Sequence, residues 1–255
     1  MTYIYDAACW CVTGKIRKKN EDNFFFDGRS LDVENKGLKH PVSCADRACS
    51  DSLVAVFDGM GGESYGEVAS FTAAACAKEA VRGFGDVIIP ESKRLLELCE
   101  RMNNAVVEKQ RELLTEHMGS TMVALLFNES YVYSCNLGDS RAYRLRCGEF
   151  LQLTEDHVER RMDSTSKKAP LTQHLGISPE ELRLEPYIAK GRLEDGDKYL
   201  LCSDGLTDML SNLEIAEIMT RLSDPEACVS ALIEAAMEKG GRDNITAIVC
   251  VVRAK

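Results

Sequence analysis

Short apolar runs that end at a polar turn recur along the chain, and this is the pattern of β-strands. Residues 52–57 read Ser-Leu-Val-Ala-Val-Phe and are followed by Asp58 and by a segment with three glycines. The run is short and contains β-branched residues, so a buried strand is favoured over a helix. Residues 198–202 form a second run before Ser-Asp-Gly, and residues 245–252 form a third run directly after Asp-Asn.

Other segments carry weaker strand patterns. Residues 120–153 have the spacing of an antiparallel meander, because short turns separate their apolar runs. The polar stretch 28–51 predicts a loop insertion before the strand at 52–57, and residues 156–170 show no regular pattern. The further strands that we predict are 3–13, 23–27, 121–127, 131–136, 142–145 and 150–153.

Helical patterns mark four segments. Residues 66–81 are rich in alanine, which suits a helix that packs closely after the glycine turn. After Pro90, apolar residues between 95 and 113 recur at helical spacing and form one stripe, which indicates packing against a core. Two later helices are predicted from their caps. Ser211 begins a capping box with a glutamate three residues later, and Asp224 precedes a proline at the first helical position.

The order of these elements predicts an α+β fold. Strands in two clusters, with helices in pairs, indicate sheets and helices arranged in layers. The hairpin-like spacing of the strands favours antiparallel pairing over βαβ crossovers. The chain shows no internal repeat and no low-complexity linker, so residues 1–255 are predicted to form a single domain.

The composition of the chain limits which partners it can bind and in which cellular compartment it is expected. The chain has 255 residues and a net charge of −10, from 31 basic and 41 acidic residues. An acidic surface argues against nucleic acid or an anionic membrane as the main partner. The N-terminus lacks the pattern of a signal peptide, and no apolar stretch is long enough to span a membrane. Eleven cysteines, mostly inside apolar runs, are therefore predicted to be reduced thiols in a cytoplasmic protein.

Acidic residues stand at four predicted strand ends or strand starts. A single Asp-Gly pair is most often a plain turn, but four such positions beside apolar strands suggest a shared site. A set of oxygen ligands suits Mg²⁺ or Mn²⁺ rather than zinc or copper, and the sequence lacks the spacing of an EF-hand. The spacing around His40, Cys44 and Cys49 does not match a zinc site, and a surface loop is expected there. The acidic residues at the four positions are Glu21 with Asp22, Asp58, Asp204 and Asp243.

Six segments around these residues carry a family resemblance. They are 14–22 (Gly-Lys-Ile-Arg-Lys-Lys-Asn-Glu-Asp), 56–62 (Val-Phe-Asp-Gly-Met-Gly-Gly), 119–121 (Gly-Ser-Thr), 137–141 (Leu-Gly-Asp-Ser-Arg), 203–206 (Ser-Asp-Gly-Leu) and 243–246 (Asp-Asn-Ile-Thr). In this order they resemble the signature motifs of the metal-dependent serine/threonine protein phosphatases of the PPM type (type 2C), in their bacterial form. The resemblance extends over nearly the whole chain.

The resemblance implies a fold and an activity. The fold would be a four-layer α-β-β-α sandwich of two antiparallel sheets flanked by helix pairs. The activity would be hydrolysis of phosphoserine and phosphothreonine in proteins by a hydroxide that bridges two Mn²⁺ or Mg²⁺ ions, in opposition to a Ser/Thr kinase. Such chemistry needs no nucleophilic side chain. The sequence accordingly has neither a cysteine in a phosphate-binding loop pattern nor a G-x-S-x-G turn.

The resemblance also implies roles for individual residues. Asp58 would bridge the two ions, and Arg17 would clamp the phosphoryl group of the substrate, for which a guanidinium offers paired donors. Asp139 and Asn244 would support the site through hydrogen bonds rather than bind metal. The remaining ligands would be Glu21, Asp22 and the Gly59 carbonyl for one ion, and Asp204 and Asp243 for the other.

Three departures from the family pattern bear on mechanism. Some relatives carry a histidine, proposed as the general acid, at the position of Met60. The bacterial members, like this chain, have methionine there. Glu116 and His117 stand where many bacterial members carry an aspartate for a third metal, so a third ion is left open. The segment 157–175 is a shortened form of the flap that covers the site in relatives, and its two histidines are expected to be supporting residues.

Two other functions stay open at the level of sequence. A non-catalytic relative would bind phosphoprotein or another partner, although such proteins usually lose their metal carboxylates first. A phosphatase of small phosphorylated metabolites would use the same centre. The chain is expected to be a monomer without a regulatory domain. The sequence does not identify the substrate protein or the opposing kinase.

Overall fold

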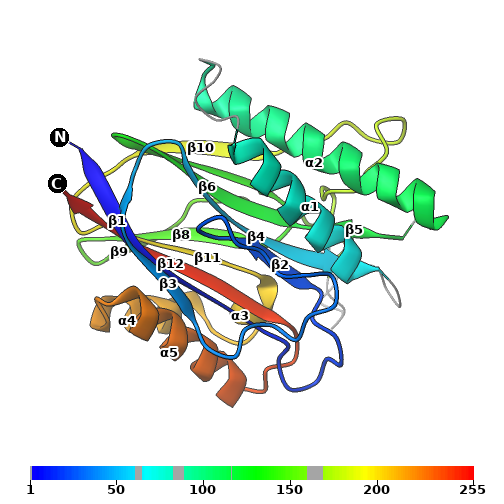
Figure 1. The fold of residues 1–255 in the computed structure, drawn as a ribbon. Helices are drawn as coiled ribbons and strands as arrows, with labels where there is room; N and C mark the ends of the chain where they lie inside the picture. The colour runs from blue at the N-terminus through cyan, green and yellow to red at the C-terminus, as the bar shows by residue number, and fades with distance from the viewer. Residues whose placement is uncertain (1, 61–64, 83–88, 116, 160–168) are drawn as a thin grey trace.

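A computed structural model describes residues 2–60, 65–82, 89–115, 117–159 and 169–255. Two antiparallel sheets lie face to face, and helices cover their outer faces (Figure 1). This arrangement confirms the predicted α+β sandwich. In the part of the chain described, no helix is long and apolar enough to cross a membrane. All eleven cysteines are free thiols.

The first sheet joins the two ends of the chain. Its strand order is β3-β1-β12-β11-β8-β9, so β1 and β12, from the two ends of the chain, lie next to each other (Figure 1). The strands of this sheet are β1 (Tyr3–Val12), β3 (Val42–Ala48), β8 (Arg141–Arg146), β9 (Glu149–Gln152), β11 (Lys198–Cys202) and β12 (Ile245–Ala254).

The second sheet has the order β10-β7-β6-β4-β2, and the short strand β5 pairs with the end of β4. Its strands are β2 (Asp22–Phe25), β4 (Ser52–Met60), β5 (Gly119–Ser120), β6 (Met122–Asn128), β7 (Tyr131–Leu137) and β10 (Tyr187–Arg192). Side chains of β4 alternate between two apolar clusters, because successive residues of a strand face opposite sides. Val54 and Val56 face the other sheet, whereas Ala55 and Phe57 face the helices. Both faces of β4 are therefore buried, and this explains its continuous apolar run.

The helices lie in pairs on the outer faces, as predicted. Helices α1 (Gly66–Val81) and α2 (Glu91–Leu113) cover the second sheet, and α4 (Asn212–Arg221) and α5 (Pro225–Glu238) cover the first (Figure 1). The predicted capping box is present, because the Ser211 side chain accepts a hydrogen bond from the backbone of Glu214 and the Glu214 carboxylate accepts one from Ser211 N–H. The Asp224 carboxylate accepts a hydrogen bond from Ala227 N–H at 2.7 Å. A one-turn helix, α3 (Asp204–Thr207), follows β11.

Two predictions of strand arrangement are wrong. The four strands between residues 120 and 153 do not form one meander, because β6 and β7 belong to the second sheet and β8 and β9 to the first. The turn at Gly138, with φ +100°, carries the chain between the sheets. Within the stretch 28–51, predicted to be a loop, β3 pairs with β1 as the edge strand of its sheet. An edge strand has few buried positions, so β3 lacks the apolar pattern that reveals a strand.

Candidate metal centre

The fold brings four distant acidic segments to one end of the two sheets. In the antiparallel pair of β2 and β4, Asp22 lies directly opposite Asp58. The Asp22 carboxylate also accepts hydrogen bonds from Ser203 Oγ at 2.7 Å and Thr246 Oγ1 at 2.6 Å. Ser203 precedes Asp204, and Thr246 lies three residues after Asp243. Asp22 therefore connects the segments that carry the other acidic residues.

Asp22 and Asp58 place a buried carboxylate close to a half-buried one. Asp22 is 1% exposed. Burial raises the pKa of its carboxyl, and the charge of Asp58 raises it further, although the two hydroxyl donors lower it. Two negative charges of this kind repel each other, and a bound cation would relieve that repulsion.

Gly59 lies where three backbone segments meet. Its N–H donates a hydrogen bond to the carbonyl of Glu21 at 3.1 Å. A Cβ atom at position 59 would lie 2.1 Å from the carbonyl oxygen of Gly66 and 2.5 Å from that of Glu21. Only glycine fits this approach. The Glu21 side chain is half-buried beside the start of α1, where burial and then the charge of Glu67 raise its pKa.

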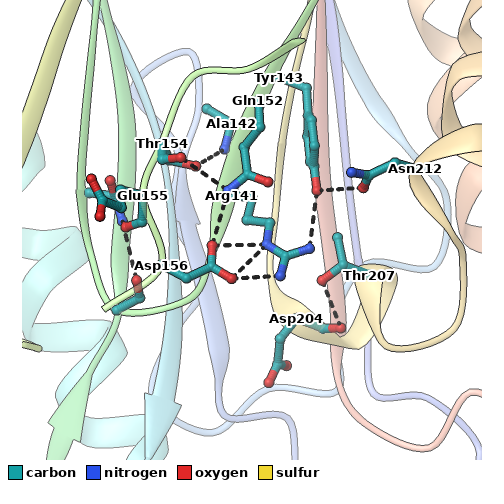
Figure 2. Close-up of polar contacts among 12 residues, drawn as sticks. Arg141, Ala142, Tyr143, Gln152, Thr154, Glu155, Asp156, Asp204, Thr207 and Asn212 are labelled. Carbon is teal, nitrogen blue, oxygen red and sulfur yellow. Dashed lines mark hydrogen bonds and ion pairs between the residues drawn. The ribbon is translucent and has the colours of Figure 1, made fainter. Parts of the chain in front are cut away.

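Asp204 and Asp243 come from segments that are in contact. Asp204 begins α3 and is 5% exposed, and Figure 2 shows its carboxylate directed away from the polar cluster around Arg141. A Cβ atom on Gly205 would lie 1.9 Å from the carbonyl oxygen of Asn244. The backbone after Asp204 therefore touches the start of β12, which follows Asp243 and Asn244.

Arg17 lies beside Asp243, 226 positions away in sequence. Its Nη2 donates a hydrogen bond to Asp243 Oδ2 at 2.7 Å, and the Arg17 side chain is 49% exposed. The Arg17 guanidinium thus reaches the acidic cluster from its solvent side. Asp139 is buried in the turn between β7 and β8, and its neighbour Ser140 contacts the hydroxyl of Thr121 at 2.7 Å.

Asn244 fixes the loop that carries Arg17 and Glu21. It is 3% exposed, and its Oδ1 accepts a hydrogen bond from Glu21 N–H at 2.7 Å. Its Nδ2 donates to the carbonyls of Thr13 at 2.8 Å and Lys19 at 2.9 Å. One buried amide therefore holds both ends of this loop, which is the kind of contact expected of a supporting residue.

Replacing Asn244 by alanine should lower the free energy of unfolding by about 2 kcal/mol, because buried backbone groups lose their partners. Urea denaturation would measure the loss. Asn104→Ala is a suitable control, since Asn104 is exposed on α2. Equal stability of the two variants would contradict the view that Asn244 holds the loop.

The carboxylates of Asp22 and Asp243 nevertheless accept hydrogen bonds from other side chains of the protein, and they do not point together toward one metal position. Among the described residues, no three His, Cys, Asp or Glu side chains are arranged to hold a metal ion. Asp22 Oδ2 accepts two hydroxyl hydrogen bonds, and Asp243 Oδ2 accepts one from Arg17. The residues themselves fit a hard divalent cation, because the donors are oxygen atoms and the neighbouring carboxylates of Asp22 and Asp58 repel each other.

Several residues at this site were not predicted. Glu67, in the first turn of α1, accepts a hydrogen bond from Lys19 at 2.8 Å, while its Oε2 is buried with no hydrogen-bond partner among the described residues. Thr121 Oγ1 accepts a hydrogen bond from Asp58 N–H at 3.1 Å. Ser203 and Thr246 supply the two hydroxyl donors of Asp22. The three hydroxyl residues lie within the motif segments, so the sequence offered a signal for them. Glu67 lies in no motif, and its only signal is its position shortly after the glycine turn.

The three departures from the family pattern are only partly covered by the structure, since residues 160–168 of the segment 157–175 lie outside the described residues. Met60 is the last residue of β4. Glu116 lies outside the described residues, so the structure does not test whether a third metal ion binds. His157 Nδ1 accepts a hydrogen bond from Gly138 N–H at 3.2 Å, and His174 Nδ1 lies 2.9 Å from the carbonyl of the next residue. Burial lowers the pKa of both imidazoles. Both therefore contact backbone in the neutral form.

Several known proteins are similar to this chain. A family model described as protein phosphatase 2C matches residues 43–239. The serine/threonine protein phosphatase PstP of Mycobacterium tuberculosis is 36% identical over 266 residues, which cover 99% of this chain and 46% of PstP. The serine/threonine phosphatase Stp of Listeria innocua is 31% identical over 251 residues, which cover 92% of this chain and 91% of Stp. The chain thus spans about half the length of the mycobacterial relative and most of the Listeria one.

Solved structures agree with these matches. The catalytic domain of PstP in complex with two manganese ions superposes with a TM-score of 0.79 at 28% identity, over 99% of this chain and 100% of that one. PppA of Pseudomonas aeruginosa, described as a regulatory component of T6SS, gives 0.77 at 26% identity, with 99% and 100% coverage. The family model alone matches more than half of the chain. This chain is therefore a member of the protein phosphatase 2C family.

Proposed function

We propose that this chain is a metal-dependent phosphatase that releases phosphate from phosphoserine and phosphothreonine in proteins. The observation that carries the proposal is the meeting of Asp22 and Asp58 with the segments of Asp204 and Asp243, which lie far apart in sequence. The relatives named above are serine/threonine protein phosphatases. In this proposal residues 1–255 act as one catalytic domain.

The acidic cluster would hold two Mn²⁺ or Mg²⁺ ions. Asp58 would bind both, and the other ligands would be those assigned by the family resemblance. When bound, such a pair of ions would lower the pKa of a bound water molecule and polarise a phosphoryl oxygen. The structure of PstP with two manganese ions supports the number of ions. The remaining ligands in this proposal are Glu21, Asp22, the Gly59 carbonyl, Asp204 and Asp243.

Arg17 would bind the substrate phosphoryl group. The Arg17 side chain is 49% exposed, and its guanidinium already binds one anion, the Asp243 carboxylate, at the surface of the site. A phosphoryl group is an anion that a guanidinium binds in the same way. A cation bound by Asp243 would compete for that carboxylate and free the donors of Arg17 for phosphate. Asp139 and Asn244 would act as supports, and the contacts of Asn244 favour this role.

The biological setting follows from the same proposal. A phosphatase of phosphoserine and phosphothreonine needs a Ser/Thr kinase to supply its substrates, so the chain would oppose such a kinase in the cytoplasm. We further propose that it acts as a monomer.

Hydrolysis of a phosphothreonine peptide tests the function. Phosphate release should require Mn²⁺, stop when EDTA is added, and be lost in the Asp204→Ala variant. A sugar phosphate assayed in parallel separates the metabolite alternative, since faster hydrolysis of the sugar phosphate would favour it. If the protein bound Mn²⁺ and released phosphate from neither substrate, the catalytic proposal would be wrong and a binding role would replace it.

A further inference from the structure

Strand β8 carries an arginine at each end, and each arginine forms a paired contact with an aspartate. At its first residue, Arg141 Nε lies 2.9 and 3.0 Å from the two carboxylate oxygens of Asp156. At its last residue, Arg146 Nε and Nη2 each lie 2.7 Å from an oxygen of Asp197. The two pairs have similar chemistry, but Arg141 alone of these arginines lies at the β8 end that adjoins the acidic cluster.

The Arg141–Asp156 pair is part of a larger polar cluster (Figure 2). Arg141 Nη2 donates to Asp156 Oδ2 at 2.5 Å, and Nη1 lies 3.3 Å from the hydroxyl of Tyr143. Gln152 donates to Asp156 at 3.1 Å, and the Tyr143 hydroxyl donates to Asn212, at the start of α4, at 3.1 Å. The pair therefore joins β8, β9 and α4 to the segment that follows β9.

A first path of contacts runs from this pair to Asp58. Ser140, which precedes Arg141, lies 2.7 Å through its hydroxyl from that of Thr121. Thr121 Oγ1 accepts a hydrogen bond from Asp58 N–H at 3.1 Å, and Thr121 N–H donates to the Asp58 carbonyl at 2.8 Å. A shift of the backbone at Arg141 would thus be transmitted to the backbone of Asp58 through two hydroxyl groups.

A second path runs to Asp22 and Asp204. Arg141 is the register partner of Cys202 in the pairing of β8 with β11. The next residue, Ser203, donates to Asp22 at 2.7 Å, and Asp204 follows it. A shift of Arg141 along its strand would therefore displace the end of β11, which precedes Ser203 and Asp204.

The two neighbours of Asp156 in sequence contact the turn that carries Asp139. The carbonyl next to Asp156, that of Glu155, accepts a hydrogen bond from Asn136 at 2.7 Å. His157 N–H donates to the carbonyl of Gly138 at 3.1 Å, and Gly138 N–H donates back to the imidazole. The segment 155–157 is thereby fastened along the turn between β7 and β8.

We propose that Arg141 and Asp156 are positioning residues for the metal centre. Their ion pair holds the turn before β8 and the end of β11 in register, and this sets the spacing of the Asp58 and Asp204 segments. The inference rests on the proposed function for its site. Supporting residues of metal centres typically change metal affinity or activity by about 10–100-fold when they are replaced.

Arg141→Gln and Arg146→Gln form a matched pair for the test. Calorimetric titration of metal-free protein with Mn²⁺ should show about 10–100-fold weaker binding for Arg141→Gln. The kcat for the phosphothreonine peptide should fall by more than its KM rises. Arg146→Gln should keep wild-type Mn²⁺ affinity, although its melting temperature should fall at least as far. Asp197 is 0% exposed and loses its cationic partner, while it keeps the hydrogen bonds from Tyr199 and Glu194.

Two outcomes would overturn the proposal. One is a melting temperature that falls in Arg141→Gln while Mn²⁺ affinity and kcat stay at the wild-type level. The other is an equal loss of Mn²⁺ affinity in Arg146→Gln, which would show that either pair acts through general stability. If Arg141→Gln does not fold, Asp156→Asn replaces it with the same readings, because this side chain is 20% exposed and keeps its shape.

The titration also separates this inference from the proposed function. A wild-type protein that binds Mn²⁺ but releases no phosphate would remove the proposed function, while the comparison of affinities would still decide the positioning role. A wild-type protein that binds no Mn²⁺ would overturn both.

Discussion

Replacing Asp58 by asparagine should abolish metal-dependent phosphate release and leave the protein folded. Asp58 lies opposite the buried Asp22 and is the proposed ligand of both ions. Asparagine keeps the shape of the side chain but removes its charge, so the cations lose the ligand that they would share. A loss of about 1,000-fold in kcat/KM corresponds to about 4 kcal/mol of transition-state stabilisation. Steady-state assays on a phosphothreonine peptide with Mn²⁺ would measure it.

Thermal unfolding with and without metal distinguishes loss of binding from loss of fold. In EDTA the Asp58→Asn protein should be at least as stable as wild type, because the repulsion between Asp22 and Asp58 is gone. Mn²⁺ at about 100 times its dissociation constant should stabilise the wild type by about 2.7 kcal/mol and the variant far less.

Asp195→Asn is the matched control for this change of charge. Asp195 is exposed and accepts a hydrogen bond from the backbone of Ala254, at the end of β12 opposite to Asp243. This variant should keep both its activity and its response to Mn²⁺. An Asp58→Asn protein that unfolds in EDTA would show instead that Asp58 is a structural residue.

Replacing Gly59 by alanine should cost both stability and metal binding. The added Cβ would lie 2.1 Å from the carbonyl oxygen of Gly66 and 2.5 Å from that of Glu21. Both atoms belong to the backbone, so the start of α1 or the loop before β2 must move. Overpacking usually costs about 1–3 kcal/mol, and a clash with two backbone oxygens should give about 3 kcal/mol or more. Urea denaturation would measure the free energy of unfolding.

Gly191→Ala serves as the control for Gly59→Ala. Gly191 lies in β10, and a Cβ there would meet only Val132 Cγ1, at the ordinary contact distance of 3.7 Å. Alanine costs less entropy on folding than glycine, so this variant should be as stable as wild type or slightly more so. A Gly59→Ala protein with wild-type stability and Mn²⁺ affinity would contradict the close approach of the three segments.

Much of the local structure was predictable from sequence. Strand and helix patterns depend on neighbours a few residues apart, and so do the caps at Ser211 and Asp224, which the structure confirms. The run before Asp58 was recognisable as a strand because both of its faces are buried. The edge strand β3 was missed for the opposite reason, since a mostly exposed strand is stabilised by its pairing with β1 rather than by an apolar pattern.

The candidate site was predictable only in part. Motif order identified the acidic segments, and the fold brings Asp22 and Asp58 into direct register. The hydrogen bond between Arg17 and Asp243 was not predicted, nor was the one between Lys19 and Glu67. These contacts join residues far apart in the chain, so no local pattern encodes them.

By itself, the sequence determined the elements of this protein and the residue types at its proposed metal centre, because both depend on side-chain chemistry and short-range spacing. Only the tertiary structure decided how the strands divide between two sheets and which partners each carboxylate has. The Arg141–Asp156 pair illustrates the difference: its residues stand in an ordinary strand and an irregular segment. Their connection to Asp58 and Asp204 arises from strand register and hydroxyl contacts that form only when the sheets assemble.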